Sequence, residues 1–268
     1  MAVDLKTRSI ERRMKSVLPS RLKSVVARLL TSRGMGRLVK ALNPRGNLFG
    51  GVYDYSLVSD RDAAQIFFGV WESAEIRFSK RFADNPVVVE LGSSVGVTLG
   101  VLAVHLPDAR LLCVEANPDN FAILQKLRER LPRPERIELI HRAIAYAGGP
   151  VAFDVTSVTG SKLGGGSIAA GRRIEVDSTT LSALLASRGI DGPYTLITDI
   201  EGAEADVFFR DPDALAGCTK IVCELEDTAE HAIAGQIERL RAIGFEVHER
   251  YGNVFFLAKP AAESRRSR

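Results

Sequence analysis

Short apolar runs alternate with amphipathic segments along the chain from residue 87 onward. The amphipathic segments place apolar residues three and four positions apart, as on one face of a helix, whereas the apolar runs are typical of strands buried on both sides. Strands that alternate with helices predict an α/β protein with a parallel sheet and helices on both of its faces. We expect the core strands over residues 87–91, 110–115, 136–141, 194–199 and 219–225.

The remaining pattern predicts the elements between these strands. Residues 151–155 and 172–176 are expected to form an inserted pair of strands around a glycine-rich segment, 160–171, which we expect to be a mobile loop. Residues 245–250 and 253–258 predict a terminal hairpin about Tyr251-Gly252, which gives the sheet an antiparallel edge. The predicted helices cover residues 97–106, 119–131, 179–188 and 228–243.

The N-terminal part differs from the rest in charge. Residues 1–48 hold 12 Lys or Arg and 2 Asp or Glu, whereas the whole chain of 268 residues has a net charge of only +3. Apolar residues such as Met14, Leu18 and Leu22 recur at helical spacing within this basic segment. We expect an arm over 1–48, a helical subdomain over 49–86, the main domain over 87–260 and a disordered basic tail over 261–268.

Two interpretations of the basic arm remain open. Its helices either cover the main domain or pair subunits in a homo-oligomer, or residues 1–40 rest on an anionic lipid surface or a lipid-linked substrate. Nucleic acid is not expected as a partner, because no aromatic residues or binding motif accompany the charge. No apolar run reaches the length of a membrane-spanning helix, and no signal peptide is recognisable. Cys113, Cys218 and Cys223 lie in apolar strands, so we expect buried free thiols and a cytoplasmic protein, with peripheral contact at the inner membrane as the alternative.

Acidic residues and glycines gather where the predicted strands end, which is where open parallel sheets bind ligands. The first strand runs into Glu90-Leu91-Gly92-Ser93-Ser94-Val95-Gly96, and the second ends at Glu115. Gly92 allows a sharp turn, and Gly96 allows the following helix to approach a ligand closely. An acid with two spaced glycines suits a positively charged ligand without phosphate, whereas three glycines would suit a dinucleotide. Glu115 suits the two hydroxyls of a ribose, in NAD as in other nucleosides, or is a solvated carboxylate.

Together these residues resemble the class I S-adenosylmethionine-dependent methyltransferases. The segment Asp199-Ile200-Glu201-Gly202-Ala203-Glu204 is similar to the acidic D-x-E-G-A-E motif of the FkbM family. Further matches over residues 65–258 are Glu72 after Phe68-Gly69-Val70-Trp71, Glu115-Ala116-Asn117-Pro118, and Cys223-Glu224. The resemblance implies a Rossmann-like class I methyltransferase fold, with a mostly parallel seven-stranded sheet, a C-terminal antiparallel hairpin and here an N-terminal helical extension.

The resemblance also implies S-adenosylmethionine as the cofactor. Glu90 would face the ammonium group of its methionine part through water or backbone groups, Glu115 would hold the ribose, and Ala143 would border the adenine. Glu72, from a segment before the sheet, would close over the methionine end. The implied cofactor-binding residues are Glu72, Glu90, Gly92, Ser93, Gly96, Glu115, Ala116, Arg142, Ala143 and Asp199.

Methyl transfer to an alcohol needs a group that accepts the hydroxyl proton. We expect Asp199 to be this general base, with Glu201 and Glu224 as alternatives, because crowded carboxylates raise each other's pKa. A divalent cation such as Mg²⁺, held by Asp199 together with Glu201, Glu224 or Asp227, is a second way to use these acids, which we do not favour. Glu204 lies near the start of a helix, and complementing the helix dipole is enough to explain an acid at this position.

The resemblance implies an O-methyltransferase, and we expect its acceptor to be a sugar hydroxyl in a bacterial surface glycan such as lipopolysaccharide. A polyketide or other small natural product is the alternative acceptor. Tyr53, Tyr55, Trp71 and the loop 160–171 either form an acceptor pocket or belong to a packed subdomain. Two other classes of protein differ in the residues that they require. An NAD-dependent sugar dehydrogenase would need G-x-G-x-x-G and Tyr-x-x-x-Lys, and a non-catalytic binding module would not need these acids.

Overall fold

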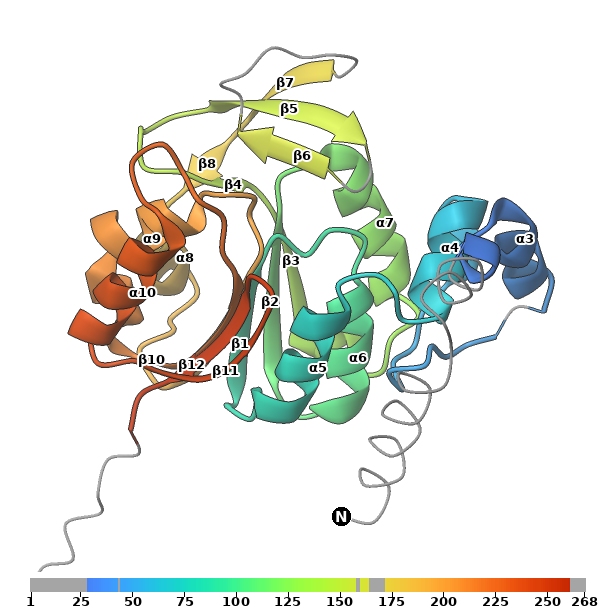
Figure 1. The fold of residues 1–268 in the computed structure, drawn as a ribbon, viewed down its shortest axis with the longest axis horizontal. Helices are drawn as coiled ribbons and strands as arrows, with labels where there is room; N and C mark the ends of the chain where they lie inside the picture. Colours follow the sequence, from blue (N-terminus) through green and yellow to red (C-terminus); the bar gives the residue numbers. More distant parts are fainter. Residues whose placement is uncertain (1–27, 43, 158–159, 164–171, 261–268) are drawn as a thin grey trace, which may run out of the picture.

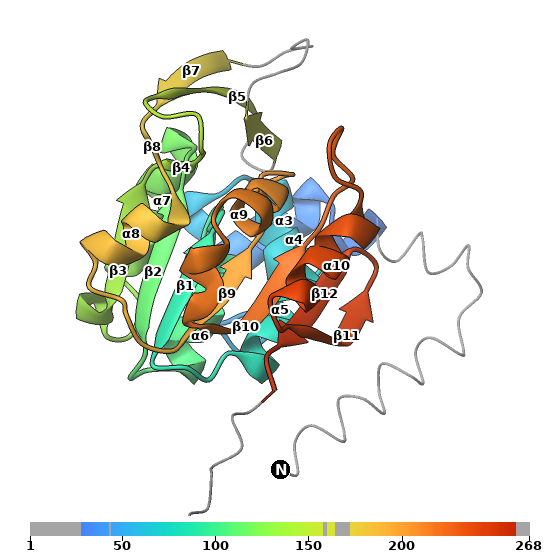
Figure 2. The same ribbon diagram turned by 90° about the vertical axis from the view of Figure 1, so that its left-hand side faces the viewer.

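A computed structural model of the protein describes residues 28–42, 44–157, 160–163 and 172–260. Its centre is a seven-stranded sheet with the strand order β11-β12-β10-β9-β1-β2-β3 (Figures 1 and 2). The five strands from β10 to β3 run parallel, and the hairpin of β11 and β12 adds the predicted antiparallel edge. The Rossmann-like methyltransferase fold expected from the sequence is therefore confirmed. The strands are β1 (Val87–Leu91), β2 (Arg110–Glu115), β3 (Ile137–His141), β9 (Tyr194–Thr198), β10 (Cys218–Glu224), β11 (Glu246–Tyr251) and β12 (Val254–Ala258).

Alternate residues of each strand point into two separate cores, because side chains of a strand alternate between its faces. Val88 belongs to the core under one face, whereas Val89 belongs to the core under the other. Figure 1 shows helices packed on both sides of the sheet, which is seen nearly edge-on. One side carries α5 (Ser73–Phe82), α6 (Val97–His105) and α7 (Pro118–Arg128), and the other carries α8 (Leu181–Ser187), α9 (Glu204–Arg210) and α10 (Ile233–Ala242).

The crossover from β1 to β9 determines where a ligand would bind. β1 pairs with β2 on one side and with β9 on the other, although about a hundred residues separate β1 from β9 in sequence. Glu90 of β1 is in register with Cys113 of β2 and with Ile197 of β9. The carboxyl ends of the three strands therefore meet at one edge of the sheet.

An inserted sheet covers this edge. It consists of β5 (Val151–Ser157), β6 (Gly160–Leu163) and β7 (Arg172–Val176), all antiparallel, and it lies at the top of Figure 1. The predicted loop 160–171 is thus wrong at its start, because residues 160–163 pair with β5, and residues 164–171 lie outside the described part. Arg172 of β7 forms an ion pair of 3.4 Å with Asp119 at the start of α7, which links the insertion to the main domain.

Some element ends differ from the prediction for local reasons. The helix expected from residue 228 begins at Ile233, because the Thr228 hydroxyl accepts a hydrogen bond from the His231 N–H and forms a turn, and Asp227 accepts the Ile233 N–H at 2.8 Å. The helix expected from residue 179 begins after Thr180, whose side chain caps it. Residues Ser178–Thr179 instead form a short strand, β8, that pairs with β4 (Ala143–Ile144). All three cysteines are buried, as predicted.

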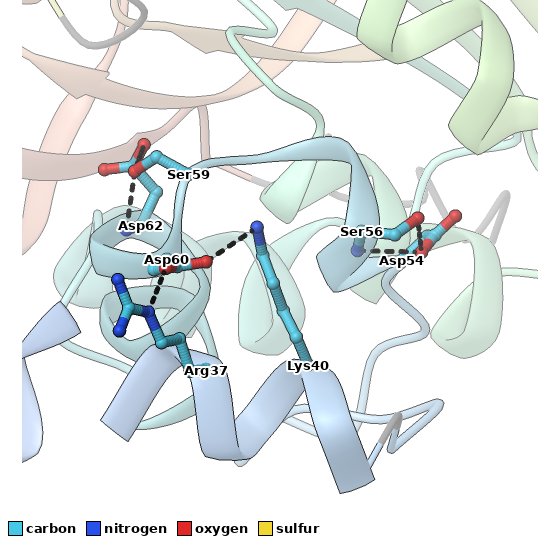
Figure 3. A network of polar contacts seen from close by, with 7 residues as sticks. All are labelled: Arg37, Lys40, Asp54, Ser56, Ser59, Asp60 and Asp62. Atoms are coloured by element: carbon cyan, nitrogen blue, oxygen red, sulfur yellow. Dashed lines mark hydrogen bonds and ion pairs between the residues drawn. The ribbon is translucent and has the colours of Figure 1, made fainter. Parts of the chain in front are cut away.

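The described end of the basic arm forms a small lobe with the segment that follows it. In this lobe α3 (Arg33–Leu42) packs on α4 (Asp60–Phe67), and Figure 1 shows α3 on the outer side. Gly36 makes the close packing possible, because a Cβ there would overlap the backbone of Asp60. Arg37 and Lys40 both lie 3.1 Å from the Asp60 carboxylate (Figure 3). The arm's residues 1–27, including Met14, Leu18 and Leu22, lie outside the described part.

The segment 49–86 shares its core with the sheet. Side chains of this segment, such as Ile66, Ile76 and Phe78, belong to the same hydrophobic cluster as Val88. Phe82 of α5 stacks on Phe256 of β12, with ring centroids 3.7 Å apart. Among the described residues, no helix combines the length and the apolar character that crossing a membrane requires.

Candidate active site

The loop between β1 and α6 begins at the ligand-binding edge of the sheet. Gly92, Ser94 and Gly96 all have positive φ angles, of 83°, 49° and 83°. The backbone N–H groups of Gly92 and Ser93 both donate to the carbonyl oxygen of Val114, at 2.9 and 3.0 Å, which fastens the loop to β2. Since Ser94 is not a glycine, its left-handed conformation costs free energy that the surrounding bonds must offset.

The two glycines of this loop are required by neighbouring protein groups. A Cβ at Gly92 would overlap the backbone carbonyl oxygen of Asp199, and a Cβ at Gly96 would lie 2.7 Å from side-chain atoms of Leu124 and Leu127 on α7. The sequence predicted a sharp turn at Gly92, and the structure has it. The close approach of a ligand at Gly96 stays a prediction, and the element that packs closely on Gly96 is α7.

Glu115 organises the loop from the end of β2. Its carboxylate accepts the N–H of Ser94 and the N–H of Asn117, each at 2.7 Å. Burial, together with the nearby charge of Glu90, raises the pKa of Glu115 to about 7, although these hydrogen bonds oppose the shift. The carboxyl thus lies where a ribose was expected, at the sheet edge between the β1 loop and the start of α7.

Glu90 has a buried oxygen that no protein group satisfies. The residue is 3% exposed, and its Oε2 atom makes no hydrogen bond to the described residues. Burial raises its pKa. The hydroxyl of Ser93, also 3% exposed, and the thiol of Cys113 interact with this carboxyl and oppose the shift. Buried polar atoms are nearly always hydrogen-bonded, so the unpartnered Oε2 of Glu90 at a sheet edge indicates a ligand that completes it.

Asp199 follows β9 and enters a turn held by Glu204. The backbone N–H of Asp199 donates to the carbonyl oxygen of Leu91 at 3.0 Å, so the two strand ends are joined. Glu204 is 1% exposed, and its carboxylate accepts the N–H of Ile200 at 2.5 Å and that of Gly202 at 2.8 Å. The sequence offered only the helix dipole for Glu204, whereas the structure assigns it the positioning of this turn.

The side chain of Glu72 lies near the carboxyl ends of these strands and comes from the start of α5. Its φ angle of 46° is left-handed, and the indole N–H of Trp71 donates to its carboxylate at 2.6 Å. Burial and the charges of Glu90, Glu224 and Glu115 raise the pKa of Glu72 to about 8. The segment before the sheet therefore brings a carboxyl to the strand ends, as the sequence predicted.

Glu75 is a buried acid that the sequence analysis missed. It is 3% exposed, and its Oε2 atom has no hydrogen-bond partner among the described residues. Burial and the charges of Glu72 and Asp199 raise its pKa well above the ordinary value. One signal existed in the sequence, because Glu75 lies next to Ala74 and Ile76 and one turn after Glu72, on a helix that buries this face.

The acids around these strand ends act on one another. Burial raises the pKa of Asp199 well above its ordinary value, and the charges of Glu72, Glu204, Glu224 and Glu201 add to the shift. Glu224 at the end of β10 is partly exposed, and burial with Glu201 and Glu226 raises its pKa too. The charges acting most strongly on Asp199 are all negative, so the site favours a ligand with positive charge.

The remaining predicted residues lie under the inserted sheet. Ala143 is 2% exposed and packs with Phe153 and Val176, and Ala116 packs against the same cluster. Arg142 forms an ion pair of 3.2 Å with Asp177. His141, which directly precedes Arg142, stacks on Phe121. The insertion thus covers the edge where an adenine was expected.

The structure decides between the two interpretations of Tyr53 and Tyr55. Tyr53 and Tyr55 are 3% and 0% exposed, so they belong to a packed subdomain and offer no ring face to an acceptor. Tyr53 instead donates its hydroxyl to the carbonyl oxygen of Val95 at 3.1 Å and supports the β1 loop. Within the described residues, no three His, Cys, Asp or Glu side chains are placed to hold a metal ion together, including Asp199, Glu201 and Glu224.

The chain is similar to several solved structures. One is the N-terminal domain of EvdMO1 with SAH bound, at 14% identity, with 85% of this chain and 97% of that chain covered and a TM-score of 0.44. PigF with SAH has 14% identity, coverage of 75% and 59%, and a TM-score of 0.40. A protein of the NADB-Rossmann superfamily from Streptococcus agalactiae has 13% identity and a TM-score of 0.41. That match covers 69% of this chain and 65% of the other, so the chain spans less than two thirds of that protein.

Sequence comparison identifies the family. No curated protein matches the chain. The family model described as the methyltransferase FkbM domain matches residues 94–252, which include the end of the β1 loop, Glu115, Asp199, Glu204 and Glu224. This match covers more than half of the 268 residues. The chain belongs to the FkbM family of methyltransferases.

Proposed function

We propose that this methyltransferase uses S-adenosylmethionine to methylate a hydroxyl oxygen, and that its acceptor is a sugar in a bacterial surface glycan. One observation supports S-adenosylmethionine as the methyl donor. Buried carboxyl groups, among them Glu72, Glu75 and Asp199, gather around the ends of β1, β9 and β10, and the neighbouring charges that raise their pKa values are all negative. When bound, S-adenosylmethionine supplies a methyl group on a positively charged sulfur, and its methionine part carries an ammonium group.

The unpartnered buried atoms fit this donor. The ammonium group is a triple hydrogen-bond donor, and Oε2 of Glu90 is a buried acceptor that lacks a partner. Glu115 lies one strand away, between the β1 loop and α7, where it can accept from ribose hydroxyls through its remaining lone pairs. Glu90 and Glu115 therefore suit the roles that the resemblance implies for them, which are binding of the ammonium group and of the ribose.

Asp199 is the proposed general base. An alcohol loses its proton as its oxygen attacks the methyl carbon, and a nearby carboxylate takes that proton. The raised pKa of Asp199 makes it a stronger base than an ordinary aspartate. Its position is set by two contacts, namely its own N–H to Leu91 and the turn held by Glu204, so the base is oriented before an acceptor arrives.

The sugar acceptor is supported by the rim of the site. Glu201 follows β9, Glu224 ends β10 and Glu226 comes shortly after it; burial and the charges of Glu201 and Glu226 raise the pKa of Glu224. Carboxylates accept hydrogen bonds from hydroxyl groups, so a rim of this kind suits a molecule with several neighbouring hydroxyls. A sugar presents such a set.

The test is transfer of labelled methyl from S-adenosylmethionine to a panel of glycan and polyketide acceptors, with and without a chelator. We expect label on a glycan hydroxyl, unaffected by chelation. Asp199→Asn should abolish transfer and retain donor binding, whereas Asp191→Asn, at the exposed opposite end of β9, should behave as wild type. Calorimetry with NAD serves as a parallel control. Lack of donor binding would refute the methyltransferase reaction, and label on polyketides alone would refute the sugar acceptor.

A further inference from the structure

The lobe of α3 and α4 exposes leucines that nothing in the described structure covers. Four of the six exposed large apolar residues in the described part lie within residues 29–48. They are Leu29 (63% exposed), Leu38 (50%), Leu42 (72%) and Leu48 (67%). Isolated exposed leucines are common, but a group of this size on one short segment marks an interaction surface.

On α3 the leucines lie opposite the packed face. Gly36 and Val39 are buried against α4, whereas Leu38 and Leu42 are one helical turn apart and point away from it. α3 therefore packs against α4 with one face only. Its exposed positions include Leu38, Ala41 and Leu42 beside Arg33 and Arg37.

The surroundings of these leucines are purely cationic. Residues 28–53 contain five Lys or Arg and no Asp or Glu. Arg37 and Lys40 are held by Asp60 (Figure 3), while Arg28, Arg33 and Arg45 are exposed. Apolar side chains bordered by arginines form the pattern of a helix that lies in the interface of an anionic membrane.

We propose that the surface formed by Leu29, Leu38, Leu42, Leu48, Arg28, Arg33 and Arg45 docks on an anionic lipid bilayer. The charge selects this partner. A second copy would place the same cations against one another, and residues 1–27 themselves hold seven Lys or Arg against two Asp or Glu. Anionic headgroups complement the cations, and the leucines then enter the headgroup boundary. This inference does not depend on the reaction that the enzyme catalyses.

Flotation of the full-length protein with vesicles tests the proposal. We expect binding to vesicles that contain phosphatidylglycerol, weak binding to pure phosphatidylcholine, and loss of binding as salt rises. Leu38→Ser with Leu42→Ser should weaken binding by about ten-fold or more, since two apolar side chains no longer leave water. Arg33→Gln with Arg45→Gln should weaken it by about ten- to thirty-fold. Tyr251→Ser, which removes another exposed apolar residue (57%) from β11, should leave it unchanged.

Each variant is checked for folding by its melting temperature and for assembly by light scattering. Because the substituted side chains are exposed, the melting temperature should stay close to that of wild type. Unchanged flotation of the double leucine variant would overturn the proposal. A wild-type dimer that this variant dissociates would overturn it as well and assign the surface to a second copy. A wild-type protein that does not float with phosphatidylglycerol vesicles would also refute it.

Discussion

Gly92 lies directly against the backbone carbonyl of Asp199, so closely that a Cβ at Gly92 would overlap the carbonyl oxygen. The first residue after β1 thus touches the proposed base after β9. The N–H of Asp199 also donates to Leu91, one residue before Gly92. The β1 loop and the proposed base are therefore fixed relative to each other by backbone contacts. A change of side-chain conformation cannot relieve an overlap at these contacts.

Gly92→Ala should destabilise the protein and impair donor binding. The φ angle of 83° costs an alanine about 1 to 2 kcal/mol, and the overlap with Asp199 adds to that. Gly148→Ala is the matched control, because Gly148 has a φ angle of 78° and open space around its Cβ position. Chemical denaturation should give Gly92→Ala the larger loss in the free energy of unfolding. Equal losses in the two variants would show that the contact with Asp199 is unimportant.

Asp199→Asn should lower kcat by about 100- to 10,000-fold, because asparagine fills the same space and cannot accept the hydroxyl proton. The affinity for S-adenosylmethionine, measured by calorimetry, should change far less than kcat. If Glu224→Gln lowers kcat in this way and Asp199→Asn does not, Glu224 is the base instead.

Stability of the donor-free protein should fall as pH rises. The pKa of Glu72 is raised from 4.5 to about 8 and that of Glu115 from 4.5 to about 7. The folded state then holds protons that the unfolded state has released, so the free energy of unfolding decreases between about 4.5 and about 8. Melting temperatures across this range measure the effect, and Glu72→Gln should flatten the slope. A melting temperature that rises with pH would contradict the assignment.

Donor affinity should follow the opposite trend. A bound cation favours the ionised form of Glu72 and Glu115, so binding releases protons and strengthens as pH rises toward about 8. Calorimetry in two buffers with different ionisation enthalpies counts the released protons. Identical heats in both buffers would show that no carboxyl ionises on binding.

Glu204→Gln should loosen the turn after Asp199. The amide can accept one of the N–H groups of Ile200 and Gly202 and turns its own NH₂ toward the other, a loss of about 1 to 3 kcal/mol. Asp206→Asn on the same helix removes only an exposed ion pair with Arg210 and should cost about 0.5 kcal/mol or less. Denaturation curves of both variants check this, and near-identical stabilities would contradict the role of Glu204.

Much of the sheet and of the acidic edge was predictable, because both depend on local pattern. Strands buried on two faces are apolar throughout, and their carboxyl ends are where Glu90, Glu115 and Asp199 occur in the sequence. The role of Glu204 was not predictable, since it depends on which N–H groups a turn presents. Glu75 was missed because an acid beside apolar helix residues resembles an ordinary surface position until the neighbouring strands are placed. Residues 160–163 were assigned to a loop because glycine and serine carry no strand pattern, and only pairing with β5 makes them a strand.

The position of β12 has a consequence for how the enzyme is made. Among the described strands this one comes last in sequence, yet it lies between β10 and β11, and its Val254 pairs with Glu224. During translation, one edge of β10 stays unpaired until residues 254–258 have left the ribosome, because its partner strand follows it by some thirty residues. The acidic edge therefore matures only after β12 has been made, and a nascent chain that stops before Val254 should not bind the methyl donor.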